Sequence, residues 1–429
     1  MRAYKEYKDS GYDWLGKIPA HWRCVKIREI FIERRNKVSD KDFPPLSVTK
    51  AGIVPQLETA AKSDDGDNRK RVNVGDFVIN GRSDRKGSSG ISPLEGSVSL
   101  INHVLIPRLG VNKAFLHYLL RSNFFIEEFY KNGRGIVADL WTTRYSDMKT
   151  IRLPLPPREE QDAIVRFLDA KCAKIDSLIK LKERQIALLN EKKQNIINQA
   201  VTRGLDPNAP MKDSGVDWIG EIPEGWEVKR LLTLAKFQNG ISEAGDFFSS
   251  GFPFITYGDV YNNYELPHEA GGVAKANLKQ QEVYSVKRGD IFLTRTSETI
   301  KEIGFSSVSI RDMAQAVFSG FLIRVRPQEG MLLPEYSKYF FRSTVVREYF
   351  SSAMNIVIRA SLGQSLLKNL PVILPPLDQQ AQIATHLDTS NQSIVTCIQS
   401  IKSSIFFLKE YKQKLISDVV TGKINMLTA

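Results

Sequence analysis

The strongest pattern of hydrophobic and polar positions in this chain is a heptad repeat, and it occurs twice. Counted in alternate steps of three and four, nine of the eleven positions from 165 to 200 are apolar, and so are nine of eleven from 384 to 419. This spacing predicts two long amphipathic helices, over about 158 to 203 and 377 to 421, each with one apolar stripe. The stripe residues, here called the seam, are Leu168, Ile175, Ile179, Ile186, Leu189, Ile196, Leu387, Ile394, Ile398, Ile401, Ile405, Leu408 and Leu415.

Proline and glycine residues mark the ends of both predicted helices. Pro157 and Pro376 stand at the first turn, where a missing N–H loses no hydrogen bond, and Gly204 and Gly422 close the far ends. At about 1.5 Å per residue each helix is roughly 65 to 70 Å long, which exceeds the diameter of a domain of about 150 residues. Most of each helix therefore needs a partner other than its own domain.

The two helices are expected to pair with each other and to run antiparallel. A single heptad stripe is more often packed on its own domain, but two matched stripes in one chain favour a coiled coil. The second globular part connects the end of the first helix to the start of the second, and the linker at 205–212 is short. Those two helix ends are therefore neighbours, which predicts an antiparallel pair with a pseudo-twofold axis.

The chain contains an internal duplication, with two halves of similar sequence. DSGYDWLGKIPAHW (9–22) recurs as DSGVDWIGEIPEGW (213–226), with nine identities in fourteen positions. Three further matches keep the same order: VNVGDFVI (72–79) with VKRGDIFL (286–293), YLLRS (118–122) with YFFRS (339–343), and LPPREEQ (155–161) with LPPLDQQ (374–380). Motifs that recur in the same order are the signature of an internal repeat.

The globular part of each half mixes helix and strand signals. Short β-branched and aromatic runs between turn residues, such as GDFVI, GDIFLT and PFITYGDVY (253–261), indicate strands. One helix is expected at 113 to 131 and one at 334 to 350, where apolar residues follow a 3.6-residue period. The predicted fold class is α+β, with two similar globular domains separated by an antiparallel coiled-coil pair. The predicted divisions are a first domain at 1–155, a long helix at 156–204, a linker at 205–212, a second domain at 213–374 and a C-terminal long helix at 375–429.

The halves agree in their framework and differ in the segments between, which suggests one scaffold carrying two different binding surfaces. Two segments in each half follow framework elements and hold Arg, Lys, Ser and Thr side chains that suit phosphate and base-edge hydrogen bonds. In the first half they contain Arg82, Ser83, Arg85, Lys86, Arg134, Thr142, Thr143, Arg144 and Tyr145. In the second half they contain Arg295, Thr296, Ser297, Thr299, Lys301, Arg359, Ser361 and Gln364. For any single residue a solvated loop is the alternative interpretation, and Trp141 and Tyr145 are also candidates for the core.

Composition and charge narrow the class of partner. Lys and Arg outnumber Asp and Glu by 60 to 48, which favours a polyanion such as nucleic acid. The excess lies in residues 1–150, with 26 basic and 18 acidic residues, whereas 213–376 hold 17 and 18, so the second half cannot bind DNA by bulk charge. No stretch is long and apolar enough for a membrane helix or signal peptide, and the three scattered cysteines are expected to be buried small apolar groups, which together predict a cytoplasmic protein.

Motifs for catalysis and for metal binding are missing from the sequence. It holds no phosphate-binding loop, no dinucleotide-binding glycine motif, no H-E-x-x-H and no Asn-Pro-Pro-aromatic tetrapeptide. PEGWEVK (223–229) resembles a nuclease arrangement only superficially, because its carboxylates are too close together and the first copy, PAHWRCV, lacks them. We therefore expect no catalytic residue, no metal site and no cofactor in this chain.

The duplicated D-S-G-x-D-W-x-G-x-I-P-x-x-W opener, the G-D strand and the L-P-P-x-x-x-Q helix start resemble the specificity subunit of type I restriction-modification systems. The resemblance spans the whole chain. It implies that each globular half recognises one part of a split, asymmetric DNA sequence, and that the helices dock two modification (methyltransferase) subunits, with restriction subunits joining through them. S-adenosylmethionine, ATP and Mg²⁺ would then belong to those partner subunits. Base contacts vary in this family, so the candidate residues above rest on their place in the repeat.

Two other classes of function stay open on the residues alone. A self-contained site-specific DNA methyltransferase or nuclease would need a catalytic motif, and activity of the purified chain on DNA would establish it. A coiled-coil scaffold without a DNA role is the other class. Absence of sequence-dependent DNA binding by the partner complex, at a stated salt concentration, would favour the scaffold.

Overall fold

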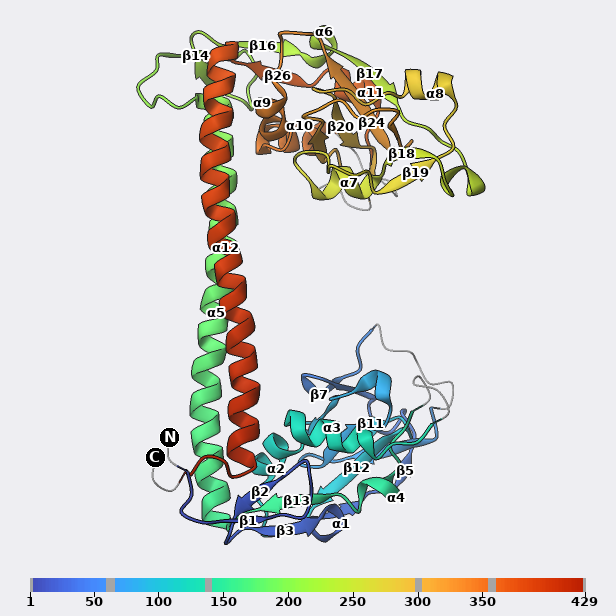
Figure 1. Cartoon of the computed structure of the whole chain (residues 1–429), viewed down its shortest axis with the longest axis vertical. Coiled ribbons are helices and arrows are strands. Elements are labelled where there is room, and N and C mark those ends of the chain that lie inside the picture. The colour runs from blue at the N-terminus through green and yellow to red at the C-terminus, as the bar shows by residue number, and fades with distance from the viewer. Residues whose placement is uncertain (1–2, 59–65, 136–140, 298–302, 354–359, 427–429) are drawn as a thin grey trace. The chain divides into compact units, whose positions relative to one another are not determined.

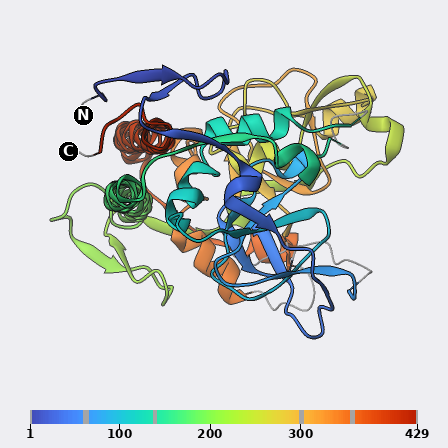
Figure 2. The ribbon, with the colours of Figure 1, turned by 90° about the horizontal axis from the view of Figure 1, so that it is seen from below.

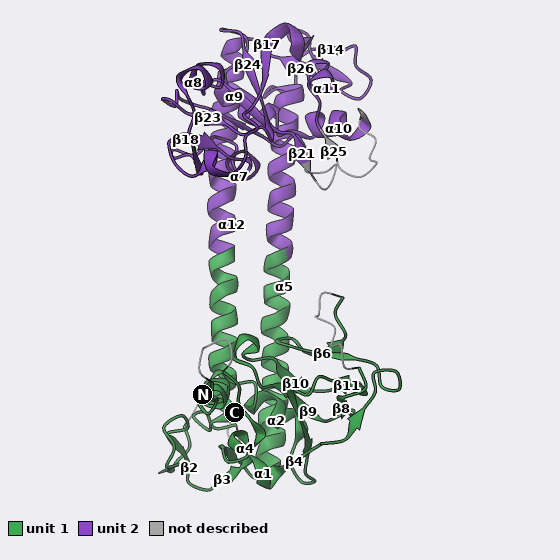
Figure 3. Ribbon diagram, turned by 90° about the vertical axis from the view of Figure 1, so that its right-hand side faces the viewer, with its two compact units in different colours: residues 1–183, 402–429 green, residues 184–401 purple. Residues whose placement is uncertain are grey.

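The computed structural model describes residues 3–58, 66–135, 141–297, 303–353 and 360–426. By its internal contacts the chain divides into two units, shown in different colours in Figure 3. Unit 1 contains residues 1–183 and 402–429, and unit 2 contains residues 184–401. Each unit combines one globular domain with one half of each long helix. Within the described part of the chain, no helix has both the length and the apolar character needed to cross a membrane.

The long helices are α5 (Arg158–Arg203) and α12 (Leu377–Val420), so their observed bounds agree with the heptad pattern to within one residue. Each ends before a glycine in the left-handed region, Gly204 at φ +76° and Gly422 at φ +79°, a conformation that favours glycine. In each unit the two helices lie side by side and run in opposite directions (Figure 1), and Figure 2 shows them end-on.

The seam residues face the partner helix or the domain. Eight of them are buried, namely Leu168, Ile175, Ile179, Leu387, Ile394, Ile401, Ile405 and Leu415. The other five, Ile186, Leu189, Ile196, Ile398 and Leu408, are half-buried. In unit 1 the two Oδ atoms of Asp176 on α5 both lie 2.7 Å from Nζ of Lys412 on α12, which forms an ion pair between the two helices.

The domain of unit 1 contains an antiparallel four-stranded sheet in the order β10-β9-β12-β4. These strands are β4 (Phe31–Glu33), β9 (Phe77–Asn80), β10 (Ser89–Ile91) and β12 (Asn102–Pro107). A smaller sheet has the order β11-β8-β5, from β5 (Lys37–Val38), β8 (Arg69–Val72) and β11 (Gly96–Val98). Smaller elements are β1 (Tyr7–Asp9), β2 (Lys17–Pro19), α1 (Ile27–Ile30), β6 (Leu46–Thr49), β7 (Gly52–Pro55) and η1 (Ser83–Arg85).

The domain of unit 2 repeats the larger sheet with the order β22-β20-β24-β17. These strands are β17 (Ala235–Asn239), β20 (Ile291–Thr294), β22 (Ser306–Val308) and β24 (Leu322–Pro327). Its second sheet differs, because β18 (Phe252–Ile255) pairs antiparallel with β19 (Gly272–Ala274) and parallel with β23 (Val317–Phe318). Smaller elements are β14 (Met211–Asp213), β15 (Glu221–Pro223), α6 (Leu231–Leu234), η3 (Gly245–Phe248), α7 (Tyr257–Asn262) and α8 (Leu278–Val283).

Each domain closes by pairing its early strand with its last one. In unit 1, β3 (Arg23–Lys26) pairs with β13 (Arg152–Leu155), and in unit 2, β16 (Glu227–Arg230) pairs with β26 (Pro371–Leu374). The closing strand leads directly into the long helix. In unit 2 the core continues from the domain into both helices, through Ile197 and Val201 of α5 and Ile383 of α12.

Several local predictions were wrong. The helix expected at 113 to 131 is two helices, α2 (Lys113–Leu119) and α3 (Asn123–Lys131), because the hydroxyl of Ser122 caps the second one by accepting from the N–H of Phe125. Likewise α9 (Pro334–Phe340) ends before α10 (Thr344–Ala353). In PFITYGDVY only the first part is a strand, because Thr256 and Asp259 form a capping box that starts α7. Of the three cysteines, only Cys172 is buried, and Cys397 is exposed.

Candidate nucleic-acid interface

In the first domain, backbone hydrogen bonds join two candidate segments that are far apart in the sequence. The N–H of Thr143 donates to the carbonyl of Gly81 at 2.9 Å, and the N–H of Ser83 donates to the carbonyl of Trp141 at 3.0 Å. Arg82 and Thr142 form an antiparallel bridge between these bonds. This short ladder begins directly after β9. Residues 81–83 and 141–143 are called the paired segments of the first domain below.

The second domain contains the same ladder. β21 (Thr296–Ser297) pairs antiparallel with β25 (Ala360–Ser361), with Thr296 opposite Ser361. The N–H of Leu362 donates to the carbonyl of Arg295 at 2.7 Å. These paired segments, 295–297 and 360–362, follow β20 as the first pair follows β9. The sequence indicated all four segments, but not that they pair, because nothing in a linear pattern reports a pairing between loops.

The ladder shows that Arg82 and Arg295 are not equivalent residues. Arg82 and Arg295 both follow equivalent strands, but Arg82 faces Thr142 whereas the residue facing the equivalent Ser361 is Thr296. Arg295 therefore corresponds to Gly81, one residue before the position that is equivalent to Arg82. Since successive side chains of an extended strand point to opposite faces, the two arginines do not present equivalent side chains.

Several candidates of the first domain lie on its surface. Arg82, Arg85 and Arg144 are exposed. Lys86 forms an ion pair with Glu127 at 2.6 Å, and Arg134 forms one with Asp147 at 3.1 Å. Ion pairs on a surface contribute about 0 to 1 kcal/mol, so DNA phosphate can displace these carboxylates at little cost. Ser83 and Thr142 have interactions of their own within the domain.

Other candidates of the first domain are buried or half-buried and pack within the domain. Thr143 is fully buried and its hydroxyl donates to the carbonyl of Phe129 at 2.9 Å, so this side chain cannot reach DNA and its prediction as a contact was wrong. Trp141 is half-buried, and its indole N–H donates to the carbonyl of Tyr130 at 2.7 Å. Tyr145 is half-buried, and burial raises the pKa of its hydroxyl.

The described candidates of the second domain lie in its ladder or at the start of the helix that follows. Arg295 and Thr296 are half-buried. Gln364, at the start of α11 (Gln364–Lys368), donates through Nε2 to Oδ1 of Asn239 at 2.9 Å. The backbones of Ser297 and Ser361 lie in the ladder, and Thr299, Lys301 and Arg359 lie outside the described residues.

A cluster of cations in the first domain was missed by the sequence analysis. Together with Glu33, Leu100, Tyr145 and Ser146, the side chains of Arg35, Lys37, Lys70 and Lys149 line a cavity of about 330 Å³, called the basic cavity here. The four cations come from three separate parts of the chain: Arg35 and Lys37 lie just before and in β5, Lys70 lies in β8, and Lys149 follows α4 (Tyr145–Met148). Because folding alone brings them together, no run of charge in the sequence marks this site.

The glutamine of the repeated L-P-P-x-x-x-Q motif joins each domain to its long helix. In unit 1, Oε1 of Gln161 accepts from the N–H of Asn112 at 2.8 Å, and its Nε2 donates to the carbonyl of Pro156 at 2.8 Å. In unit 2, Gln380 makes the same two bonds, to the N–H of Leu333 and the carbonyl of Pro375, both at 2.9 Å. Both glutamines are buried, so each holds its helix start firmly on the domain.

A second repeated bond links each domain to the side of the helix. The hydroxyl of Tyr118 donates to Oδ1 of Asp169 at 2.6 Å, and the hydroxyl of Tyr339 donates to Oδ1 of Asp388 at 2.7 Å. Burial, with the neighbouring carboxylate, raises the pKa of both phenols, so they remain donors at neutral pH. The repeated YLLRS and YFFRS segments thus hold the domains in the same way.

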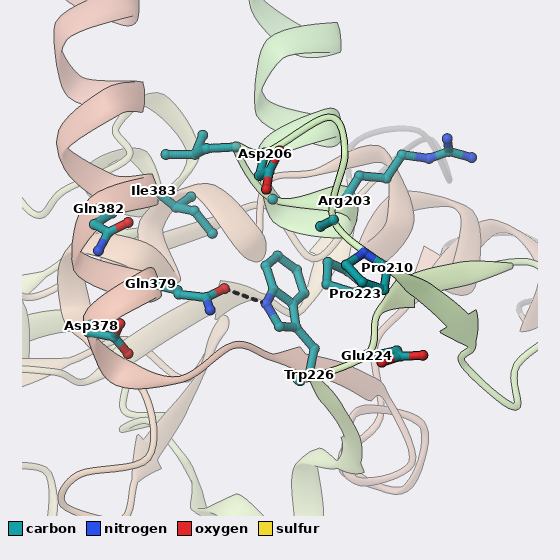
Figure 4. Close-up of a pocket in the computed structure, with 14 residues that line it drawn as sticks. Arg203, Asp206, Pro210, Pro223, Glu224, Trp226, Asp378, Gln379, Gln382 and Ile383 are labelled. Carbon is teal, nitrogen blue, oxygen red and sulfur yellow. Dashed lines mark hydrogen bonds between the residues drawn. The ribbon is translucent and has the colours of Figure 1, made fainter.

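The tryptophan at the end of the repeated 14-residue motif bonds to the first turn of the long helix in each unit. The acceptor differs between the two units. In unit 1 the indole N–H of Trp22 donates to the carboxylate of Glu160, at 3.0 Å, which also accepts from the hydroxyl of Tyr4. In unit 2 the indole N–H of Trp226 donates to the neutral Gln379 at 2.7 Å, at the edge of a cavity of about 630 Å³ (Figure 4).

These geometries describe a molecule that presents two similar, independently varied surfaces on one duplicated framework. In the part of the chain that the structure describes, no group of three or more His, Cys, Asp and Glu residues could hold a metal ion. What the duplication repeats is a ladder with variable side chains, two domain-to-helix links and a paired helix. Such an arrangement is typical of a recognition protein.

Comparison with known proteins shows which family the chain is similar to. A family model described as type I restriction modification DNA specificity domain matches residues 223–405. The specificity subunit of the type I restriction enzyme MjaVIII from Methanocaldococcus jannaschii is 24% identical over 455 residues, which cover 99% of this chain and 98% of that protein.

Two solved structures share the fold. A structure described as the basis of complex assembly and conformational transition of the type I R-M system has a TM-score of 0.69 at 18% identity, and covers 95% of this chain and 99% of its own. The crystal structure of the HsdS subunit from Thermoanaerobacter tengcongensis has a TM-score of 0.52 at 20% identity, and covers 97% of this chain and 100% of its own. Over residues 223–405 the chain matches this DNA specificity domain, and over nearly its whole length it is similar to specificity subunits of type I restriction-modification systems, which are the non-catalytic DNA-recognition components of those systems.

Proposed function

We propose that this chain binds a bipartite, asymmetric DNA sequence, and that each globular domain recognises one half-site through its paired segments. The observation that supports this most directly is the ladder, which has the same register in both domains but carries Arg82 opposite Thr142 in one and Thr296 opposite Ser361 in the other. One framework thus carries two different sets of residue types that can form hydrogen bonds. Two unlike surfaces in one duplicated chain suit two unlike half-sites.

We further propose that the helices dock two modification subunits, through which restriction subunits join. In unit 1 the outer faces of α5 and α12 expose Leu181, Phe406 and Phe407, with 66%, 60% and 67% of each residue accessible. In unit 2 Leu188 and Val395 are exposed on the same two helices. Apolar side chains grouped on a surface mark sites of protein association. S-adenosylmethionine, ATP and Mg²⁺ would be held by those partners, and the assembly would act on DNA in the cytoplasm.

The docking proposal can be tested with the double variant Phe406→Ser, Phe407→Ser. We expect it to keep its fold, because both side chains are exposed, and to lose co-purification with the modification subunit. The exposed Lys409→Ser is the matched control. Full assembly of the double variant would show that this face is not the docking site.

The experiment that tests DNA recognition is a map of methylated bases in cellular DNA with and without this gene. A bipartite motif should disappear on deletion. Replacing residues 20–150 by the corresponding segment of another family member should then change one half-site and leave the other. If both half-sites changed together, the assignment of one half-site to each domain would be wrong.

A further inference from the structure

The basic cavity lies beside the paired segments of the first domain. Two of its lining residues, Tyr145 and Ser146, follow Arg144 in the chain, and Lys149 ends the same turn. Tyr145 also packs near the ring of His103, whose Nε2 lies 2.8 Å from the carbonyl of Thr143. The cavity is therefore connected to the ladder by direct packing. Its volume of about 330 Å³ is well above the roughly 30 Å³ that one water occupies in the liquid.

The charges that line the basic cavity are unbalanced. Arg35, Lys37, Lys70 and Lys149 face one carboxylate, Glu33, whose Oε2 is already paired with Nε of Arg35 at 2.6 Å. Three ammonium groups are thus left without a carboxylate among the lining residues. Gathering like charges around one space is unfavourable, and an anion in that space would remove the repulsion.

Lys70 is a cation of this wall that the fold holds in place. It is half-buried, its Nζ donates to the carbonyl of Asn102 at 2.7 Å, and burial lowers the pKa of its ammonium group. Tyr145 and Ser146 add hydroxyl groups to the same wall. Ammonium, guanidinium and hydroxyl groups around one space are the donor set that proteins use for phosphate.

The second domain offers an internal comparison, because different side chains stand at the equivalent positions. By the register of β4 and β17, Glu33 and Arg35 correspond to Phe237 and Asn239. Gln364, which corresponds to Tyr145, bonds to Asn239, and Lys368, which corresponds to Lys149, lies 5.8 Å from the centre of the Phe237 ring. The two domains therefore differ at this place, where the first domain carries Glu33 and Arg35 and the second carries Phe237 and Asn239.

We propose that the basic cavity binds one phosphate group of the DNA backbone next to the first half-site. The proposal rests on the proposed function. It assigns the cavity a positioning role, since a phosphate contact fixes the register of the duplex on the domain and carries no sequence information. It also accounts for the uneven charge of the two halves, because only the first domain would hold a phosphate in this way.

The test measures the affinity of the assembled complex, the full chain with its modification subunits, for a duplex that carries its methylation motif. Lys149→Gln should weaken binding by about tenfold, and equally for target and non-target duplexes. It should also reduce the slope of log affinity against log salt by about 1, the contribution of one phosphate. Lys37→Gln, at an exposed position, should act in the same direction, and Lys149→Arg should restore binding.

Lys368→Gln is the matched control, since it removes the same charge at the equivalent position of the second domain. It should leave affinity and salt slope unchanged. Equal losses for Lys149→Gln and Lys368→Gln, or no loss for both Lys149→Gln and Lys37→Gln, would overturn the proposal.

A second arm identifies the source of the phosphate. Duplexes with one neutral methylphosphonate at each position in turn should reveal one position where the change weakens the wild-type complex but not Lys149→Gln. If no such position exists and inorganic phosphate alone competes at this cavity, the ligand is a free anion and the DNA assignment is wrong. Failure of the proposed function is distinguishable: the wild-type complex would then show no preference for target over non-target duplex, whatever the salt slope.

Discussion

Arg82 stands where the two paired segments of the first domain meet, exposed and opposite Thr142. If its guanidinium makes a bidentate contact with a base, Arg82→Ala should weaken binding by about 1 to 3 kcal/mol and relax specificity at one position of one half-site. Binding to duplexes with single base changes measures this. A uniform loss across all sequences would assign Arg82 to a phosphate instead.

The second domain supplies the comparison for Arg82. Its equivalent residue is Thr296, so Thr296→Ala should alter one position of the other half-site. Arg295→Ala tests the corrected register, because this side chain points to the opposite face of the strand. An effect of Arg295→Ala that matched that of Arg82→Ala in kind and position would contradict the register.

His117 makes the stability of unit 1 sensitive to acid. Burial, followed by the nearby Arg121, lowers its pKa from 6.5 to about 4 in the folded chain. The folded state therefore binds fewer protons than the unfolded state between these values, so the stability is complete above about pH 6.5 and falls as the pH is lowered toward 4. The loss should be at most about 2 kcal/mol at pH 5, since one pKa unit corresponds to about 1.4 kcal/mol.

The variant His117→Gln isolates this effect from the titration of carboxylates. Its stability relative to the wild type should rise as the pH falls from 7 to 5, as measured by urea unfolding of the full chain at each pH. The equivalent residue of the second half is Lys338, whose Nζ lies 2.7 Å from a carboxylate oxygen of Glu265. Parallel stability curves for His117→Gln and the wild type would show that His117 is not the sensitive group.

At the scale of elements, the links between domain and helix can be tested at Gln380. The substitution Gln380→Leu leaves the N–H of Leu333 and the carbonyl of Pro375 without their buried partner, which should cost about 2 to 4 kcal/mol. Hydrogen exchange at the Leu333 amide should also be faster in this variant than in the wild type, because the amide has lost its acceptor. The exposed Gln382→Leu, two residues further along α12, should stay within about 0.5 kcal/mol of the wild type. An unchanged exchange rate at Leu333 would show that Gln380 does not link the domain to the helix.

Elements whose pattern repeats over many residues could be predicted from the sequence, whereas the ends of short helices could not. The bounds of α5 and α12 follow from heptads, prolines and glycines that repeat over more than forty residues each. The break at Ser122 was hidden because α2 and α3 continue the same 3.6-residue period of apolar side chains across it. The candidate segments could be found from divergence between the halves. Their pairing and the basic cavity depend on contacts between distant residues, which a linear pattern does not contain.

At the scale of the whole molecule, the spacing between half-sites should follow the length of the helices. The end of α5 is a poor place to lengthen it, because Val201 is fully buried and Gly204 lies against Trp226. One heptad added to both helices, after 183 in α5 and after 401 in α12, keeps the seam in phase. Seven residues add about 10.5 Å, close to three base pairs of DNA at about 3.4 Å each.

Methylation mapping of this insertion variant should show both half-sites unchanged and the gap between them longer by about three base pairs. A heptad added to α5 alone is the control, since it leaves the helices of unequal length and should abolish methylation. An unchanged gap with full activity in the double insertion would mean that the helices do not set the spacing.

The antiparallel pairing in unit 1 also has a consequence for how the protein is made. The part of α5 in this unit is complete once residue 183 has been synthesised, but the part of α12 that covers it begins at residue 402, more than 200 residues later. At about 5 to 20 residues per second, the ribosome needs roughly 10 to 50 s to supply that partner. During this interval the seam residues Leu168, Ile175 and Ile179 of the nascent chain lack their partner helix, so binding of this face by another protein would protect the chain from aggregation until residues 402–429 emerge.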